Sequence, residues 1–322
     1  MRFWLFIILV LFLFCYVLSE TKTSQLIRMN GQSVDHDEII DNHLFTNFID
    51  INDSKKKKVF IHIPNERNNR NWASFYDRSS NDLNISICNW CIKSAIHHLS
   101  DSYDVILYTN ENVRDLIQES NENDLCNVQN PSMLQGVDLR QWEHYCKSKI
   151  LLKYGGVVME PYFFWTQCPN ENILFPNDFM ILRHVNEGQS VSSIPLIPDT
   201  SYFMSSSKND ENLKLYMEYL KYICVNHYSE DHKRFDKTFE KLYALKQVHP
   251  KWMGIVDSRD EPVFAHRLFE KENIEFNDDA FCLFIHVPLL KKYTKYGYIM
   301  KMSEAQIRDS HNFLGEFIRF HT

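Results

Sequence analysis

The stretch DLRQWEHYCKSKILLKYGGVVMEPYFFW, residues 138–165, gives the strongest indication of the fold of this chain. Its first half predicts a helix over 138–153, because apolar residues recur there at helical spacing. These residues are Leu139, Trp142, Cys146 and Ile150. Asp138, followed three residues later by Gln141, matches the capping-box pattern. We therefore expect the helix to begin at Asp138.

A strand follows this helix after two glycines. Gly155 fits the C-cap of the helix, Gly156 permits a close backbone approach, and the apolar residues 157–159 predict a short, buried, central strand. Glu160 comes directly after this strand, and Pro161 ends it. Open α/β sheets bind ligands at the carboxyl ends of their strands. The pattern therefore places Glu160 at a candidate binding edge.

Two strand–helix units precede this stretch. Residues 58–63, KVFIHI, and 104–108, DVILY, are apolar runs that predict strands. Helical patterns follow them, over 86–99 and in NVRDLIQES from residue 112. The alternation of strands and helices predicts an α/β fold, Rossmann-like, with a mostly parallel central sheet flanked by helices.

The composition narrows the class of protein further. Against 42 Asp and Glu there are 35 Lys and Arg, and a net charge of −7 argues against a nucleic-acid partner, because phosphate backbones bind basic surfaces. The 322 residues, 44% of them hydrophobic, suffice for one large α/β domain. No G-x-G-x-x-G follows the first strand, which disfavours dinucleotide binding.

The apolar run Phe3–Leu18 predicts an export or membrane segment over 1–19. Its length falls between a signal-peptide core of ~7–15 residues and a comfortable bilayer span of ~20. Two interpretations stay open: an uncleaved anchor with Arg2 on the cytoplasmic side, and a signal peptide cleaved after Ser19. Both place the body in a Golgi- or ER-like lumen or outside the cell, as a single-pass membrane protein in the first case and secreted in the second.

The rest of the chain divides into a polar stem or linker over 20–54 and a folded body over 55–322. Asn52 and Asn84 begin N-glycosylation sequons, which fit a secretory compartment. All cysteines but Cys15 lie outside the apolar run, and their odd number leaves at least one thiol unpaired or shared between chains. The sequence alone does not assign disulfide pairs.

The segment from Val59 to about Leu174 resembles the DXD-type glycosyltransferases of the capsular-polysaccharide and initiation-specific mannosyltransferase kind. Trp90 in the first predicted helix, the strand region 103–113 and the residues 151–158 around Gly-Gly carry the resemblance, over about a third of the chain. The resemblance implies a nucleotide-sugar transferase (GT-A) fold, a nucleotide-sugar donor and a glycan or glycoprotein acceptor. It also implies Mn²⁺ or Mg²⁺ held by a pair of aspartates.

The sequence departs from this family at the residues that carry the chemistry. His144 stands where the family has Asp, Lys147 where it has Arg, and Glu160-Pro161-Tyr162 where it has the Asp pair. One carboxylate cannot supply that pair, because a hard divalent ion needs several oxygen ligands. Two functions therefore stay open: a membrane-anchored glycosyltransferase-like enzyme, and a catalytically inactive relative that binds sugar or protein.

Several acidic and imidazole side chains are candidates to complete a catalytic or metal site with Glu160. Asp257 and Asp260 follow the apolar stretch 252–256, an expected strand end, and could supply a base or a ligand. A solvated turn is the alternative for both. His286 follows the strand-like run 281–285 and could bind a metal, or be a buried structural histidine.

Basic and aromatic side chains are candidates for substrate binding. Arg67 and Arg70 lie in the loop after the first strand and could clamp a diphosphate, with a solvated loop as the alternative. Lys147 takes the position of the family's arginine. Tyr162 begins an aromatic run, residues 162–165, that could stack on a sugar or belong to the core.

Overall fold

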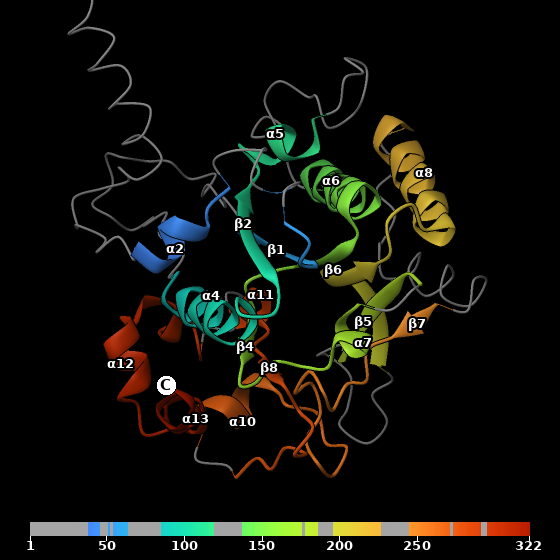
Figure 1. The fold of residues 1–322 in the computed structure, drawn as a ribbon. Helices are drawn as coiled ribbons and strands as arrows, with labels where there is room; N and C mark the ends of the chain where they lie inside the picture. The colour runs from blue at the N-terminus through green and yellow to red at the C-terminus, as the bar shows by residue number, and fades with distance from the viewer. Residues whose placement is uncertain are drawn as a thin grey trace, which may run out of the picture. The chain divides into compact units, whose positions relative to one another are not determined.

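The computed structural model describes most of the expected body (Figure 1). The described residues are 38–45, 51, 54–63, 85–118, 137–175, 178–185, 196–226, 245–270, 273–290 and 295–322, and all belong to one compact unit. The apolar run 3–18, both sequon asparagines, Arg67 and Arg70 lie outside these ranges. In the described part of the chain, no helix is long and apolar enough to cross a bilayer.

A six-stranded mixed sheet forms the centre of the molecule, with the strand order β2-β1-β3-β6-β5-β7. Its strands are β1 (Lys58–Ile63), β2 (Asp104–Thr109), β3 (Gly156–Met159), β5 (Met180–Val185), β6 (Leu196–Ser206) and β7 (Lys246–Gln247). β1 pairs in parallel with both β2 and β3, and β5 pairs in parallel with β7. The α/β class, the mostly parallel sheet and the central position of β3 are thus confirmed.

β6 adds an antiparallel component that the sequence analysis did not anticipate. It runs antiparallel to both β3 and β5, with Met159 opposite Phe203. Because β6 enters the sheet beside β3, residues 199–202 come to lie next to the carboxyl end of β3. Residues 199–202 therefore border the residues that follow β3.

Helices cover both faces of the sheet (Figure 1). They are α4 (Ile85–Leu99), α5 (Val113–Ile117), α6 (Val137–Tyr154) and α8 (Glu211–Asn226). Val59, Ile61 and Val157 pack in the core cluster that contains α4, whereas Phe60 and Val158 pack in the cluster of α5, α6 and α8. Successive residues of a strand face opposite sides, so two covered faces explain the continuous apolar runs of β1, β2 and β3.

A second, two-stranded sheet joins β4 (Phe163–Trp165) to β8 (Cys282–Phe284). All three residues of β4 are buried, so the aromatic run belongs to the core. Smaller helices complete the fold: α7 (Glu171–Leu174), α10 (Ala265–Phe269), α11 (Val287–Leu290), η3 (Ile299–Lys301), α12 (Glu304–Arg308) and α13 (Phe313–His321).

Gly156 lets β3 lie close to β1. Its φ is +102°, and a Cβ on this residue would lie 2.3 Å from the backbone oxygen of Lys58. Only a residue without a side chain tolerates this approach. The glycine identified in the sequence therefore has the expected role.

Three local expectations need correction. Helix α6 begins at Val137, so Asp138 lies inside it and is not its N-cap. Residues 252–256 form turns with one isolated bridge, not a strand, because Gly254 takes a positive φ there. A helix, α2 (Glu38–His43), occupies part of the expected stem, and Phe45 after it donates a backbone hydrogen bond to Leu107 of β2.

Candidate functional site

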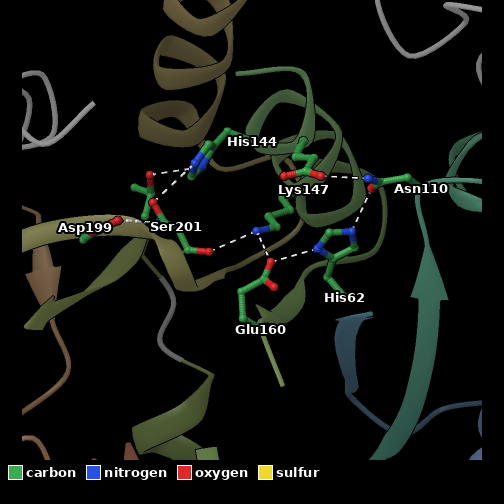
Figure 2. A network of polar contacts seen from close by, with 9 residues as sticks. His62, Asn110, His144, Lys147, Glu160, Asp199 and Ser201 are labelled. Atoms are coloured by element: carbon green, nitrogen blue, oxygen red, sulfur yellow. Dashed lines mark hydrogen bonds and ion pairs between the residues drawn. The ribbon is translucent and has the colours of Figure 1, made fainter. Parts of the chain in front are cut away.

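Three polar side chains meet where the parallel strands β1, β2 and β3 end (Figure 2). His62 lies near the end of β1, Asn110 directly follows β2, and Glu160 directly follows β3. The parallel register aligns these ends, since His62 pairs with Tyr108 and Ile61 with Met159. Carboxyl ends of parallel strands are the common ligand-binding edge of open α/β sheets.

Two basic side chains share one oxygen of Glu160. The Nζ atom of Lys147 donates to Oε1 at 2.5 Å, and Nδ1 of His62 lies 2.8 Å from the same oxygen. Glu160 is 6% exposed, Lys147 4% and His62 1%. Lys147 comes from α6, and its Nζ also donates to the backbone oxygen of Ser201 at 3.0 Å. Glu160, Lys147 and His62 thus form a buried, ion-paired triad.

Asn110 and Glu143 hold the other side of the His62 ring. Oδ1 of Asn110 lies 2.7 Å from Nε2 of His62, and Nδ2 of Asn110 donates to Glu143 Oε1 at 2.7 Å. Glu143 lies four residues before Lys147, on the same face of α6. Both nitrogens of the ring are thus engaged, which fixes its orientation.

The neighbouring charges shift the pKa values of Glu160 and His62. Burial alone would raise the pKa of Glu160, but Lys147 and His62 lower it to about 2. Burial lowers the pKa of His62, and the carboxylate of Glu160 outweighs burial, so the pKa lies above its ordinary value of 6.5. Each charged group favours the charged form of its partner.

A second polar cluster connects His144 to β6 and α8. The Nε2 atom of His144 lies 3.4 Å from Oγ of Ser201, and its Nδ1 lies 3.4 Å from Oγ1 of Thr200. Thr200 Oγ1 forms a 2.6 Å hydrogen bond with the hydroxyl of Tyr216, and Asp199 accepts from the amide of Ser201 at 2.7 Å. These contacts position Ser201, whose carbonyl holds Lys147.

The structure brings Lys147 and Glu160 together but keeps the acidic candidates elsewhere. Asp257 is fully buried, pairs with Arg267 at 2.7 Å and accepts amide hydrogen bonds within its own turn. Burial would raise the pKa of Asp257, but Arg267 and these amides lower it. Asp260 is exposed, has a φ of +64° and pairs with Lys251. None of these contacts reaches Glu160, so both aspartates are assigned to a structural turn.

His286 and Tyr162 lie near the site without joining the triad. Nε2 of His286 lies 3.4 Å from the hydroxyl of Tyr202, and its Nδ1 accepts from the amide of Leu289 at 3.3 Å. Tyr162 is buried, with its ring 6.0 Å from that of Tyr202. The ring of Tyr162 thus packs in the core cluster against which Tyr202 lies.

The triad does not fit a divalent metal. Within the described ranges, no group of three or more His, Cys, Asp or Glu side chains is arranged to hold an ion. A metal on Glu160 would lie beside the ammonium of Lys147, which already occupies one oxygen of the carboxylate. Two cations bound to the same carboxylate repel each other strongly in a buried site.

His62, Asn110 and Glu143 were not among the site residues expected from the sequence. The sequence does contain a signal for His62 and Asn110. Each follows a strand residue that faces α6 by two positions, and alternate residues of a strand face the same side. His62 follows Phe60 by two, and Asn110 follows Tyr108 by two. Polar residues at such positions, at the ends of adjacent parallel strands, indicate a shared site.

No protein-family model and no curated protein sequence matches this chain. The fold and the triad are therefore the features that bear on its function.

Proposed function

We propose that this chain is a glycosyltransferase-like protein with a GT-A nucleotide-sugar transferase fold. A nucleotide-sugar donor would bind at the edge formed by His62, Asn110 and Glu160, and a glycan or glycoprotein would accept the sugar. The observation that carries this proposal is the convergence of these side chains at the carboxyl ends of three adjacent parallel strands. Ligands of open α/β sheets bind at this edge.

The proposal includes attachment to a membrane of the secretory pathway. The apolar run 3–18 would anchor the chain, with the body in the lumen of a Golgi- or ER-like compartment or outside the cell. Cleavage after Ser19 would release the same body as a secreted protein.

A specific observation favours a second candidate, a non-catalytic GT-A-fold protein that binds sugar or protein. Glu160 has a pKa of about 2 and is ion-paired twice through Oε1. A carboxylate with so low a pKa is a poor general base at neutral pH. Such a protein would bind a nucleotide-sugar without transferring the sugar.

Donor binding and donor turnover separate the two candidates. The full chain is titrated calorimetrically with a panel of common UDP-, GDP- and CMP-sugars, and each donor that binds is then assayed for hydrolysis and for transfer to glycan acceptors. Binding with turnover supports the transferase, and binding without turnover supports a module that binds the nucleotide-sugar. Binding of no donor rejects the transferase and leaves only a module that binds another sugar or a protein.

The variant Glu160→Gln tests the site itself, since it keeps the shape of the side chain and removes its charge. We expect it to weaken donor binding or abolish turnover. Glu304→Gln is the matched control, because Glu304 also pairs with a lysine, Lys93, at 2.6 Å, on α12 and away from the triad. Equal behaviour of the two variants would contradict the assignment.

A further inference from the structure

We infer that Lys147, supported by the positive charge of His62, is a built-in cation that binds the phosphate groups of a donor, so that donor binding requires no divalent metal. The inference rests on the proposed function, which supplies the phosphorylated ligand. It differs from the metal dependence expected from the sequence, and it follows from the triad itself.

Lys147 lies where a cation would contact the carboxylate of Glu160. Its ammonium group lies 2.5 Å from Glu160 Oε1, where a cation bound to this carboxylate would lie. The carbonyl oxygen of Ser201 accepts a second hydrogen bond from the same group. An ammonium has three donors, and the described residues accept only two of them, which leaves one N–H for an incoming oxygen.

The hydrogen bonds of His62 define the charge of its ring. The carboxylate of Glu143 can only accept, so Asn110 donates to it through Nδ2 and presents Oδ1 to His62. Nε2 of His62 must then donate to Asn110. Nδ1 faces the carboxylate of Glu160 and must donate as well. A ring that donates from both nitrogens is an imidazolium, so the triad contains a second cation.

The basic groups of the triad outnumber its one carboxylate. Lys147 and His62 are two cations in direct contact with one carboxylate, Glu160, and Glu143 reaches the ring only through Asn110. The triad by itself therefore has an excess of one positive charge. Phosphate oxygens form their strongest hydrogen bonds with cationic donors. A diphosphate complements this excess, whereas a divalent cation adds to it.

Calorimetry on the full chain tests metal independence directly. UDP, GDP, CDP and ADP are used as probes, each with EDTA and, separately, with Mn²⁺. We expect at least one nucleotide to bind with EDTA, and its Kd to change less than about twofold with Mn²⁺. Binding that occurs only with Mn²⁺ would overturn the inference and leave the proposed function intact. No binding under either condition would reject both.

Two variants of Lys147 test the built-in cation. Lys147→Met removes the charge at similar length and should weaken nucleotide binding in EDTA about tenfold or more, as expected for the loss of a charged hydrogen bond. Lys147→Arg keeps the charge and should retain most of the affinity. The matched control is Lys93→Met, which removes a lysine paired with Glu304. Unchanged binding in Lys147→Met would overturn the inference.

Manganese binding to the parent protein and to Glu160→Gln is a second measurement, which does not require Lys147→Met to fold. The electron paramagnetic resonance signal of free Mn²⁺ decreases when a protein binds the ion. We expect the parent protein and Glu160→Gln to have the same effect on this signal. A decrease that Glu160→Gln abolishes would show a metal site at the triad and would overturn the inference.

Discussion

Glu160 keeps its charge in a nearly dry position because two basic side chains compensate for the lost hydration. Burial of a lone carboxylate would raise its pKa, yet Lys147 and His62 lower this pKa to about 2. The three groups therefore depend on one another. Removal of Glu160 leaves two buried basic groups without their carboxylate, and removal of either basic group leaves Glu160 with one partner.

This dependence predicts a large loss of stability in Glu160→Gln. Breaking a buried ion pair from one side costs about 3 kcal/mol or more, because the remaining charges stay buried. Glu304→Gln breaks a half-buried pair and should cost less than about 1 kcal/mol. Urea unfolding of both variants measures the free energies of unfolding. Equal losses would contradict the description of the triad as a buried, coupled unit.

The ion pair of His62 and Glu160 predicts a pH range in which its contribution to stability is complete. The pKa of His62 is raised above 6.5, so its contribution is complete below pH 6.5 and is lost as the pH rises through the folded-state pKa. The pKa of Glu160 falls from 4.5 to about 2, so its contribution is complete above pH 4.5 and is lost as the pH falls toward 2. Both contributions are complete between these values.

The variant His62→Gln tests this window. The difference in free energy of unfolding between the parent and His62→Gln should be larger at about pH 5.5 than at about pH 8.5. Chemical unfolding at the two pH values measures it. A difference that does not depend on pH would show that His62 is not charged in the folded protein.

At the scale of elements, the unit of α6, the glycine pair and β3 carries the site. Lys147 and Glu143 on α6 and Glu160 after β3 belong to this one unit. β1 must lie close to β3 for His62 to reach Glu160. Gly156 permits this distance.

We therefore predict that Gly156→Ala destabilises the protein by about 2 kcal/mol or more. Its Cβ would lie 2.3 Å from the oxygen of Lys58, at a φ of +102° that a side chain disfavours. Asn209→Gly is the comparison, because Asn209 also has a positive φ, +62°, but is exposed. That variant should change stability by less than about 0.5 kcal/mol. Thermal unfolding of the two variants measures the contrast.

At the scale of the whole molecule, the body is expected to be held on a membrane by the run 3–18. The full chain should stay in the membrane fraction after alkaline carbonate extraction. In a glycosylating host, enzymatic deglycosylation should lower its apparent mass, and the double variant Asn52→Gln, Asn84→Gln should lack this shift. Release of the intact protein by carbonate, or the absence of glycan at both positions, would contradict the prediction.

The sequence by itself determined the elements whose signals are local. The apolar spacing of 138–153 predicts α6, the two glycines predict the turn into β3, and the run 104–108 predicts β2. Each signal lies within one element, because a helix or a buried strand must show its apolar period in consecutive residues. The position of Glu160 at the carboxyl edge follows from these elements alone.

Only the tertiary structure decided which side chains form the site. His62 is 98 residues from Glu160 and 48 residues from Asn110, and strand pairing brings them together. Asp257 and His286 follow apolar runs of similar appearance, but one lies in a structural turn and the other contacts Tyr202. A single sequence carries the period of each element but not the order of strands in the sheet, because that order depends on contacts between residues far apart in the chain.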